Sequence, residues 1–309
     1  FSLTQAPLPE NRSQIVEALR QAEMVSYDVE TEWSITNLGA LLLAKDLREF
    51  PALSRKAPRV VRYDGRGRAS TIRRQDGQRG YAAGFDGLID YLMALLPQRE
   101  IIEGALRTTV GYPVLAVREL VANALIHQDL SITGMGTMVE VFDDRIEITN
   151  PGKPLIPVDR FIDLPPRSRN EKLSGAMRRL RICEEQGSGW DKVTAAIELH
   201  QLPPPLVETQ ENATRVVVFG PRPLARMEKA DRIRAVYQHA CLRYVMHENM
   251  TNTTVRQRFG LDDKARPTAS RLIREAVNAR AVVAYDPTVG NKSLRYVPWW
   301  ASPGREAVS

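Results

Sequence analysis

RELVANALIH, residues Arg118 to His127, is the stretch of this chain that decides its fold. Its apolar residues recur at helical spacing, which predicts an amphipathic helix. Those residues are Leu120, Val121, Ala124 and Leu125. Glu119, Asn123 and His127 recur every four residues and therefore lie along one face of the same helix. The spacing thus predicts a row of three polar side chains.

Such a row can carry out nucleotide chemistry. A carboxylate can orient or deprotonate a water, and an amide oxygen one turn away can ligate Mg²⁺ beside phosphates. Glu119 is therefore the candidate catalytic residue and Asn123 the candidate metal ligand, with His127 as a further candidate for cofactor contact. On spacing alone, an exposed polar stripe without chemistry is the commoner alternative.

A predicted hairpin follows this helix. Met138 to Phe142 alternates as a strand, Asp143-Asp144 suits a tight turn, and Arg145 to Thr149 returns as a second strand. The second strand ends in Asn150-Pro151-Gly152. The hairpin is therefore expected to bring this NPG turn next to the helix.

A glycine pair stands further downstream. Gly187 and Gly189 precede a predicted helix from Asp191 to His200, and glycines before a helix let backbone N–H groups approach an anion. A lone GxG is weak evidence. The ordered series of helix, hairpin ending in NPG, and GSG before a helix is much more specific for a phosphate-bearing ligand.

At these residues the sequence resembles a known family, the degenerate ATPases labelled after the C-terminal part of the RecG helicase and often found behind a Schlafen-type AlbA domain. The resemblance is strongest over roughly residues 100–220. It rests on RELVANALIHQDLS (Arg118 to Ser131), VEVFDDRIEITNPG (Val139 to Gly152), SRNEKL (Ser168 to Leu173) and EEQGSGWDKV (Glu184 to Val193).

The resemblance implies an α+β protein with an α/β sandwich of the GHKL class, which includes gyrase, histidine kinases and MutL. It implies ATP and Mg²⁺ as cofactors, Glu119 as the water-activating base and Asn123 as the Mg²⁺ ligand. Asn150 and Gly152 fall where that class has an Asp-x-Gly adenine site, and Gly187 and Gly189 fall at its lid or phosphate-binding segment.

Asn150 departs from this pattern, because the class has an aspartate there, although an amide oxygen can still accept the adenine hydrogen bond. We therefore expect ATP binding, and leave open weak ATP hydrolysis or a nucleotide-independent scaffold with a vestigial ATPase fold. Helicase activity is not expected, because the chain contains no GxxxxGK[ST] phosphate-binding loop.

The bulk composition is that of a cytoplasmic globular protein. Of 309 residues, 43% are hydrophobic and 26% charged, and the longest apolar stretches, such as Leu38 to Ala44, fall short of the roughly 20 residues that span a bilayer. Two cysteines and four scattered histidines give no zinc-ligand spacing. The sequence opens on Phe1, so we expect an upstream segment, which in this family can be an AlbA domain.

Three domains are predicted, with boundaries at residues 1–98, 99–222 and 223–309. The first is a mixed α/β region, in which a strand from Arg59 to Tyr63 leads into a turn at Gly65-x-Gly67. Helical periodicity there covers Ser13 to Glu23, Thr36 to Ala44 and Phe85 to Leu96. Residues 220–228 are proline-rich and are expected to form a linker to the third domain.

The third domain carries the basic excess of the chain. From Arg226 onward there are 15 Lys and Arg against 8 Asp and Glu, whereas the whole chain has a net charge of +6. Concentrated positive charge favours nucleic-acid binding, although a solvated basic face is the alternative. Three helices are predicted: Asp231 to Glu248, a short one that Thr251 or Asn252 can cap and that runs through Phe259, and Thr268 to Ala279. Followed by two strands, they resemble a winged helix-turn-helix domain.

This resemblance assigns DNA contacts. The start of the third helix would meet base edges or phosphates, and the wing would meet phosphates. The helix residues are Arg266, Thr268, Ser270, Arg271 and Arg274, and the wing residues are Lys292 and Arg295. The chain is therefore predicted to be a DNA-binding transcriptional regulator with double-stranded DNA and ATP as partners. A homodimer is a further expectation, because helix-turn-helix regulators often dimerise. The alternative is that this domain serves dimerisation or protein contact instead of DNA binding.

Overall fold

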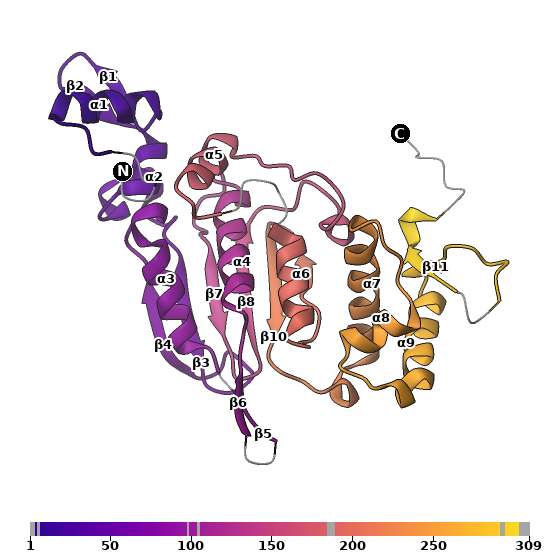
Figure 1. Ribbon diagram of the computed structural model, residues 1–309. Helices are drawn as coiled ribbons and strands as arrows, with labels where there is room; N and C mark the ends of the chain where they lie inside the picture. The colour runs from indigo at the N-terminus through magenta and orange to yellow at the C-terminus, as the bar shows by residue number, and fades with distance from the viewer. Residues whose placement is uncertain are drawn as a thin grey trace.

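The computed structural model describes residues 4, 7–97, 99–103, 106–183, 189–290 and 294–302 (Figure 1). Its centre is a six-stranded sheet in which only β3 and β7 pair in parallel, while all other neighbours are antiparallel. In spatial order the strands are β4 (Thr71–Asp76), β3 (Arg59–Tyr63), β7 (Met138–Val141), β8 (Arg145–Pro151), β10 (Ala213–Phe219) and β9 (Leu206–Thr209).

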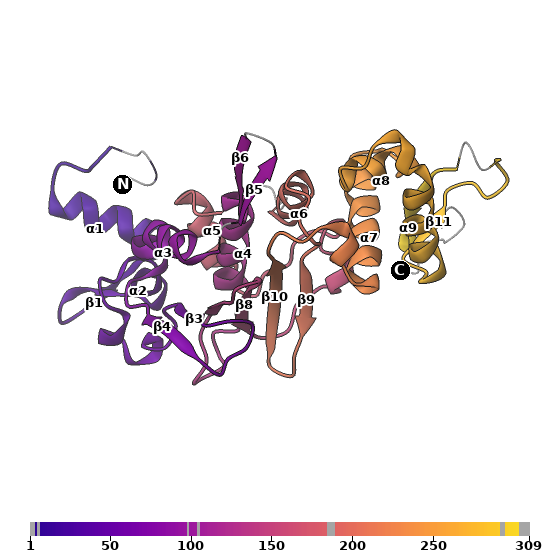
Figure 2. The ribbon, with the colours of Figure 1, turned by 90° about the horizontal axis from the view of Figure 1, so that it is seen from below.

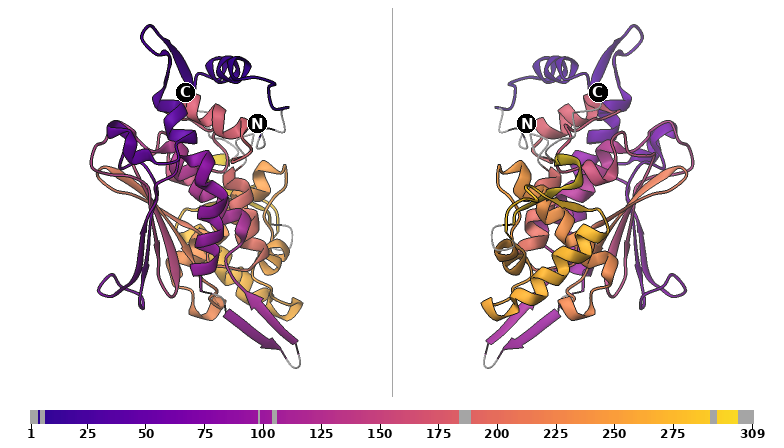
Figure 3. Two further views of the ribbon diagram at one scale, coloured as in Figure 1. Left: turned by 90° about the vertical axis from the view of Figure 1, so that its left-hand side faces the viewer. Right: turned by 90° about the vertical axis from the view of Figure 1, so that its right-hand side faces the viewer.

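Three helices cover one face of this sheet, as the edge-on view of Figure 3 shows. They are α3 (Tyr81–Leu95), α4 (Val114–His127) and α6 (Gly189–Leu199). The central helix α4 packs against both β8 and α6, and Leu120 and Leu125 are fully buried against Ile146 and Ile148 in one core. The fold is therefore α+β, with a helical layer on one mixed sheet. No helix in the described ranges has the length and apolar character needed to cross a bilayer.

The predicted central hairpin is confirmed, and β8 is longer than expected. It continues through Asn150 and Pro151, so the NPG turn is the last part of a strand that pairs with β10. Ile146 and Ile148 face the helices, and Glu147 between them therefore faces the opposite side of the sheet. On that side Arg68 bridges Glu147 and its strand neighbour Glu140.

The N-terminal region lies beyond the β4 edge of the sheet (Figure 2). The predicted helices are confirmed there: α1 (Arg12–Gln21) is capped by Asn11, and α2 (Asn37–Leu43) is capped by Thr36. A hairpin of β1 (Val25–Asp28) and β2 (Glu32–Ile35) joins them and was not expected from the sequence. A second unexpected hairpin, β5 (Arg99–Glu103) and β6 (Leu106–Val110), precedes α4.

The C-terminal region contains the three expected helices and two expected strands. They are α7 (Lys229–Val245), α8 (Asn252–Arg258), α9 (Arg266–Asn278), β11 (Val282–Ala284) and β12 (Tyr296–Pro298). Thr251 caps α8 in a reciprocal capping box with Thr254, and Pro267 lies in the first turn of α9. A buried cluster that includes Met250, Leu272 and Val282 forms a separate small core.

Helix α7 belongs to two cores at once. The sequence places one apolar stripe on it, whereas the structure divides that stripe between two sides. Val236 and Ala240 enter the small C-terminal core, and Tyr237 and Cys241 enter the main core beside α6. A helix wedged between two packed bodies must be apolar toward both. Residues 220–228 therefore connect two regions that are packed against each other.

Candidate functional site

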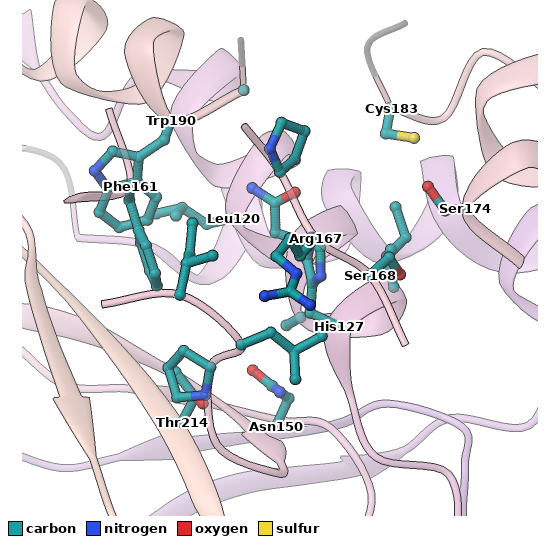
Figure 4. A pocket seen from close by; sticks show the side chains of 18 of the residues that line it. Leu120, His127, Asn150, Phe161, Arg167, Ser168, Ser174, Cys183, Trp190 and Thr214 are labelled. Atoms are coloured by element: carbon teal, nitrogen blue, oxygen red, sulfur yellow. The ribbon is translucent and has the colours of Figure 1, made fainter. Parts of the chain in front are cut away.

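The row Glu119, Asn123 and His127 faces a pocket of about 210 Å³ above the ends of β8 and β10 (Figure 4). A water needs roughly 10–15 Å³ on this measure, so the pocket has room for a small organic ligand. Glu119 is 6% exposed. Asn123 and His127 are half-buried, so the row is turned toward a cavity and is not the exposed stripe that was the alternative.

Two neighbouring strands supply the polar floor of the pocket. Asn150 on β8 and Thr214 on β10 are direct partners in the strand ladder, and Figure 4 shows them together at the base. Asn150 Nδ2 donates to the carbonyl oxygen of Pro151 at 3.1 Å, so its Oδ1 is the atom left to accept from a ligand. Thr214 Oγ1 donates to the carbonyl oxygen of Gly152 at 2.7 Å. Sequence reasoning missed Thr214, because only strand pairing brings it to Asn150.

Apolar side chains form one wall. Trp190, in the first turn of α6, meets Phe161 edge-to-face with ring centroids 5.2 Å apart. Both line the pocket together with Leu120, Ile156 and Val216. Cys183 and Ser174 lie across the pocket from this wall in Figure 4. An apolar wall beside a polar floor suits a flat aromatic ring with hydrogen-bonding edges.

Gly152 closes the turn at the floor with a positive φ of 95°. A Cβ built on it would lie 2.8 Å from Asp129 Cβ and 3.2 Å from Asp129 N. Asp129 N in turn donates to the carbonyl oxygen of Pro151 at 2.8 Å. The glycine therefore permits close approach between the NPG turn and the chain that leaves α4.

The SRNEKL motif holds the other side of that chain. Arg169 Nη1 donates to the carbonyl oxygen of His127 at 3.0 Å. Asn170 Nδ2 donates to the carbonyl oxygens of Ile126 and Gln128, each at 2.7 Å. These donors satisfy carbonyls that the end of α4 leaves without helical partners. The motif thus fixes the end of the helix that carries the polar row.

Gly189 lies directly over that row. A Cβ there would be 2.8 Å from Glu119 Oε2 and 3.6 Å from Asn123 Nδ2, so any larger residue would require the Glu119 carboxylate to shift. The N-terminal end of a helix favours a nearby negative charge, such as that of Glu119. Gly187, the other predicted glycine, lies outside the described residues.

Most of the charged side chains that line the pocket are cationic. Lys153, Arg167, Arg169 and Arg178 line it, whereas Glu119 is the only lining carboxylate among the described residues. Arg178 comes from α5 (Glu171–Arg179), a helix that the sequence did not predict. Four basic side chains against one carboxylate indicate that the pocket suits an anionic ligand.

His127, which lines the pocket, and Asp191, which follows the lining residue Trp190, have shifted pKa values. Burial, with a smaller contribution from Arg169, lowers the pKa of His127, so its imidazole is neutral at pH 7. Burial and the nearby carboxylate of Asp163 raise the pKa of Asp191, in the first turn of α6, to about 6. A neutral His127 can donate one hydrogen bond and accept another.

The predicted DNA-contacting residues gather on α9 at the far end of the molecule from α1 (Figure 2). Arg266, Ser270, Arg271 and Arg274 are exposed, and Thr268 is half-buried. Arg271 pairs with Glu275 at 2.9 Å, and Ser270 accepts from Asn252 Nδ2 at 3.0 Å. Arg295 is exposed next to β12, and Lys292 lies outside the described residues.

Part of the basic excess of this region does not reach its surface. Arg256 and Arg258 are buried, the former against Asp263 and the latter beside Glu198 of α6. Their charge serves packing within the molecule. The surface available to phosphates is therefore less positive than the residue count indicates.

The region around the central sheet resembles a known protein family. Residues 134–218 match a family described as "Putative ATP-dependent DNA helicase recG C-terminal". The matched range covers β7 to β10 and ends before the C-terminal helices, and α4 with Glu119 and Asn123 precedes it. The expected resemblance to this family is confirmed for that range.

A solved structure resembles nearly the whole chain. The DIP2311 protein from Corynebacterium diphtheriae aligns with a TM-score of 0.56 and 20% sequence identity. The alignment covers 94% of this chain and 58% of that one, so this chain spans a little over half the length of that relative. At this identity the likeness concerns the fold alone. No functionally curated protein matches the sequence.

Proposed function

We propose that this chain is a DNA-binding regulator whose central sandwich, of GHKL type, binds ATP with Mg²⁺. One observation supports the proposed ATP binding: a single cavity is lined by the polar row Glu119, Asn123 and His127, by Asn150 and Thr214 at its floor, and by basic side chains. The match of residues 134–218 to an ATPase-like family supports it.

The pocket has a place for each part of the nucleotide. The adenine ring would lie against the apolar wall with its amino group toward Asn150 Oδ1 and Thr214, and the phosphates would face the cationic side chains. Mg²⁺ would take the Asn123 amide oxygen, water and phosphate oxygens, since this ion prefers few protein ligands. Among the described residues there is no cluster of three or more His, Cys, Asp or Glu that could hold a metal ion.

ATP hydrolysis is a second candidate activity, and the position of Glu119 favours it. Its carboxylate is buried at the pocket wall beside Asn123, where a general base would act on a water near bound phosphates. Phosphate release that is unchanged in Glu119→Gln would remove that role.

The C-terminal region supplies the DNA half of the proposal. Three helices followed by a two-stranded hairpin, with Met250 bridged to Tyr296, match the order of a winged helix-turn-helix. The exposed arginines of α9 would then enter a DNA groove, and the loop between β11 and β12 would be the wing.

Calorimetric titration with Mg²⁺ and ATP tests the nucleotide half. Arg178→Gln should weaken ATP binding at least five-fold, since loss of a charge-assisted hydrogen bond costs about 1.5–3 kcal/mol. Arg179→Gln is the matched control, because this neighbouring arginine is exposed and does not line the pocket. Absence of ATP binding by the unaltered chain, or equal effects of the two substitutions, would count against the site.

Fluorescence anisotropy with a short DNA duplex at several salt concentrations tests the DNA half. Arg271→Ala with Arg274→Ala should weaken binding and reduce the slope of log K against log salt by about two. Arg12→Ala with Arg20→Ala removes the same charge from α1, at the other end of the molecule, and should have little effect. Equal losses in both double variants would refute the assignment of α9.

A further inference from the structure

The segment from Lys153 to Asn170 touches both proposed binding regions. Its two ends line the pocket, through Lys153 to Ile156 on one side and Pro166 to Arg169 on the other. Its middle, the short turn η3 (Val158–Arg160), lies against α7 and the residues after β12. One continuous stretch therefore reaches from the pocket to the C-terminal region.

Three side chains make the contact at the middle. Tyr237 of α7 donates its hydroxyl hydrogen bond to the carbonyl oxygen of Asp159, and Trp300 Nε1 donates to that same hydroxyl at 3.1 Å. The Arg160 guanidinium lies 4.4 Å from the centroid of the Trp300 ring. We call Asp159, Arg160, Tyr237 and Trp300 the Tyr237 cluster.

The Tyr237 cluster connects to the proposed DNA-binding elements on its other side. Trp300 follows β12 by two residues, and β12 pairs with β11 in the hairpin that carries the wing. Helix α7 packs against α9, which carries the exposed arginines. A shift of η3 would therefore displace both α7 and the base of the wing.

A second contact between the regions is buried and leaves little freedom to move. The Glu198 carboxylate of α6 lies 2.9 Å from His239 Nδ1 of α7 through Oε2, and 3.5 Å from Arg258 Nε of α8 through Oε1. Arg258 also donates to the carbonyl oxygen of Leu202 at 2.8 Å. Because breaking a buried ion pair is costly, we expect this contact to stay closed when the Tyr237 cluster rearranges.

We propose that the Tyr237 cluster couples the pocket to the C-terminal region, so that MgATP and DNA change each other's affinity. The inference rests on the proposed function. Leu155 and Arg167 line the pocket, and they flank η3 in the same short segment, so a ligand that contacts either one acts on this segment. Thermodynamic linkage requires that each ligand change the affinity of the other by one common factor, typically 5–150-fold.

The experiment measures both affinities in both states. DNA binding is followed by anisotropy of a labelled duplex of random sequence, with and without saturating MgATP, and ATP binding is followed by calorimetry, with and without that duplex. In the unaltered chain we expect the two affinities to change by the same factor, of at least five-fold. Tyr237→Phe removes the hydroxyl and with it the hydrogen bonds to Asp159 and Trp300, and should bring this factor below two-fold while each separate affinity is kept.

Tyr244→Phe is the matched control. Tyr244 packs edge-to-face on Trp300 with centroids 5.1 Å apart, and its hydroxyl makes no hydrogen bond with the described residues, so its loss should leave the coupling factor unchanged. Arg160→Gln is a second test on the other side of the cluster, in case Tyr237→Phe does not fold, and should also reduce the factor.

The outcomes separate the two proposals. If the unaltered chain binds both ligands with no mutual effect, or if coupling survives in Tyr237→Phe and Arg160→Gln, the coupling proposal is wrong and the proposed function stands. If the unaltered chain fails to bind ATP or DNA, the proposed function itself is refuted, and the coupling with it.

Discussion

Replacing Gly152 by alanine should destabilise the protein by more than its backbone angle alone requires. At a φ of 95° any Cβ costs about 1–2 kcal/mol. The new Cβ would also lie 2.8 Å from Asp129 Cβ, well inside the roughly 3.5–4.0 Å at which carbon atoms pack. The hydrogen bond from Asp129 N to Pro151 O holds these chains together, so relief requires a backbone shift, at about 1–3 kcal/mol. We expect a total loss of about 2–5 kcal/mol.

Gly134→Ala is the control that measures the backbone part of this loss, and the difference between the two variants gives the steric part. Gly134 has a φ of 74°, and a Cβ there would meet no atom within 4 Å, so its substitution should cost the backbone strain alone. Urea unfolding followed by circular dichroism gives both free energies of unfolding. Gly152→Ala should be the more destabilising by about 1–3 kcal/mol. Equal losses in the two variants, within about 0.5 kcal/mol, would refute the inferred overlap with Asp129.

Three further predictions concern stability. Arg68→Met leaves the buried carboxylates of Glu140 and Glu147 facing each other and should lower the free energy of unfolding by about 1–3 kcal/mol. This is less than the roughly 3–5 kcal/mol of a fully buried pair, because Arg68 is 49% exposed. The control Arg74→Met, at an exposed arginine, should change it by less than about 0.5 kcal/mol, and equal losses in urea unfolding would contradict the role of Arg68. Folding raises the pKa of Asp191 to about 6, so its carboxylate destabilises the folded state above pH 4, and this effect grows as the pH rises to about 6. Asp191→Asn should therefore raise the free energy of unfolding by about 1–2 kcal/mol at pH 7, after allowance for partial exposure and the helix N-terminus, and leave it unchanged at pH 4. A gain that does not depend on pH would refute this cause. Thr251→Ala removes the α8 cap and should cost about 1 kcal/mol in thermal unfolding, whereas no loss would mean that the capping box is dispensable.

Periodic features were predictable from the sequence, and long-range contacts were not. The α4 row, the β7–β8 hairpin and the cap of α8 at Thr251, one of the two candidates for that cap, follow from local spacing, and the structure confirms them. Strand β4 was missed because every one of its residues is exposed, so it lacks apolar alternation. Strand β9 was also missed, because it is short and follows three prolines.

Only part of the pocket lining was predictable from the sequence. Its helix row and NPG turn are local motifs, but Thr214 reaches the floor through strand pairing, and Arg178 reaches the wall from a helix with few apolar residues. The quoted SRNEKL motif was recognised as a pattern, while its hydrogen bonds to the end of α4 depend on contacts more than 40 residues apart. Spacing within one segment carries no information on such contacts.

The dual packing of α7 determines how the chain can be divided. A cut at the proline-rich stretch 220–228 would produce a C-terminal fragment with Tyr237 and Cys241 uncovered, and a remainder whose α6 has lost its neighbour. Both pieces would expose apolar surface and tend to associate or aggregate. A boundary that is evident in the composition is therefore unsuited to producing either half alone, and the two regions should melt in a single transition.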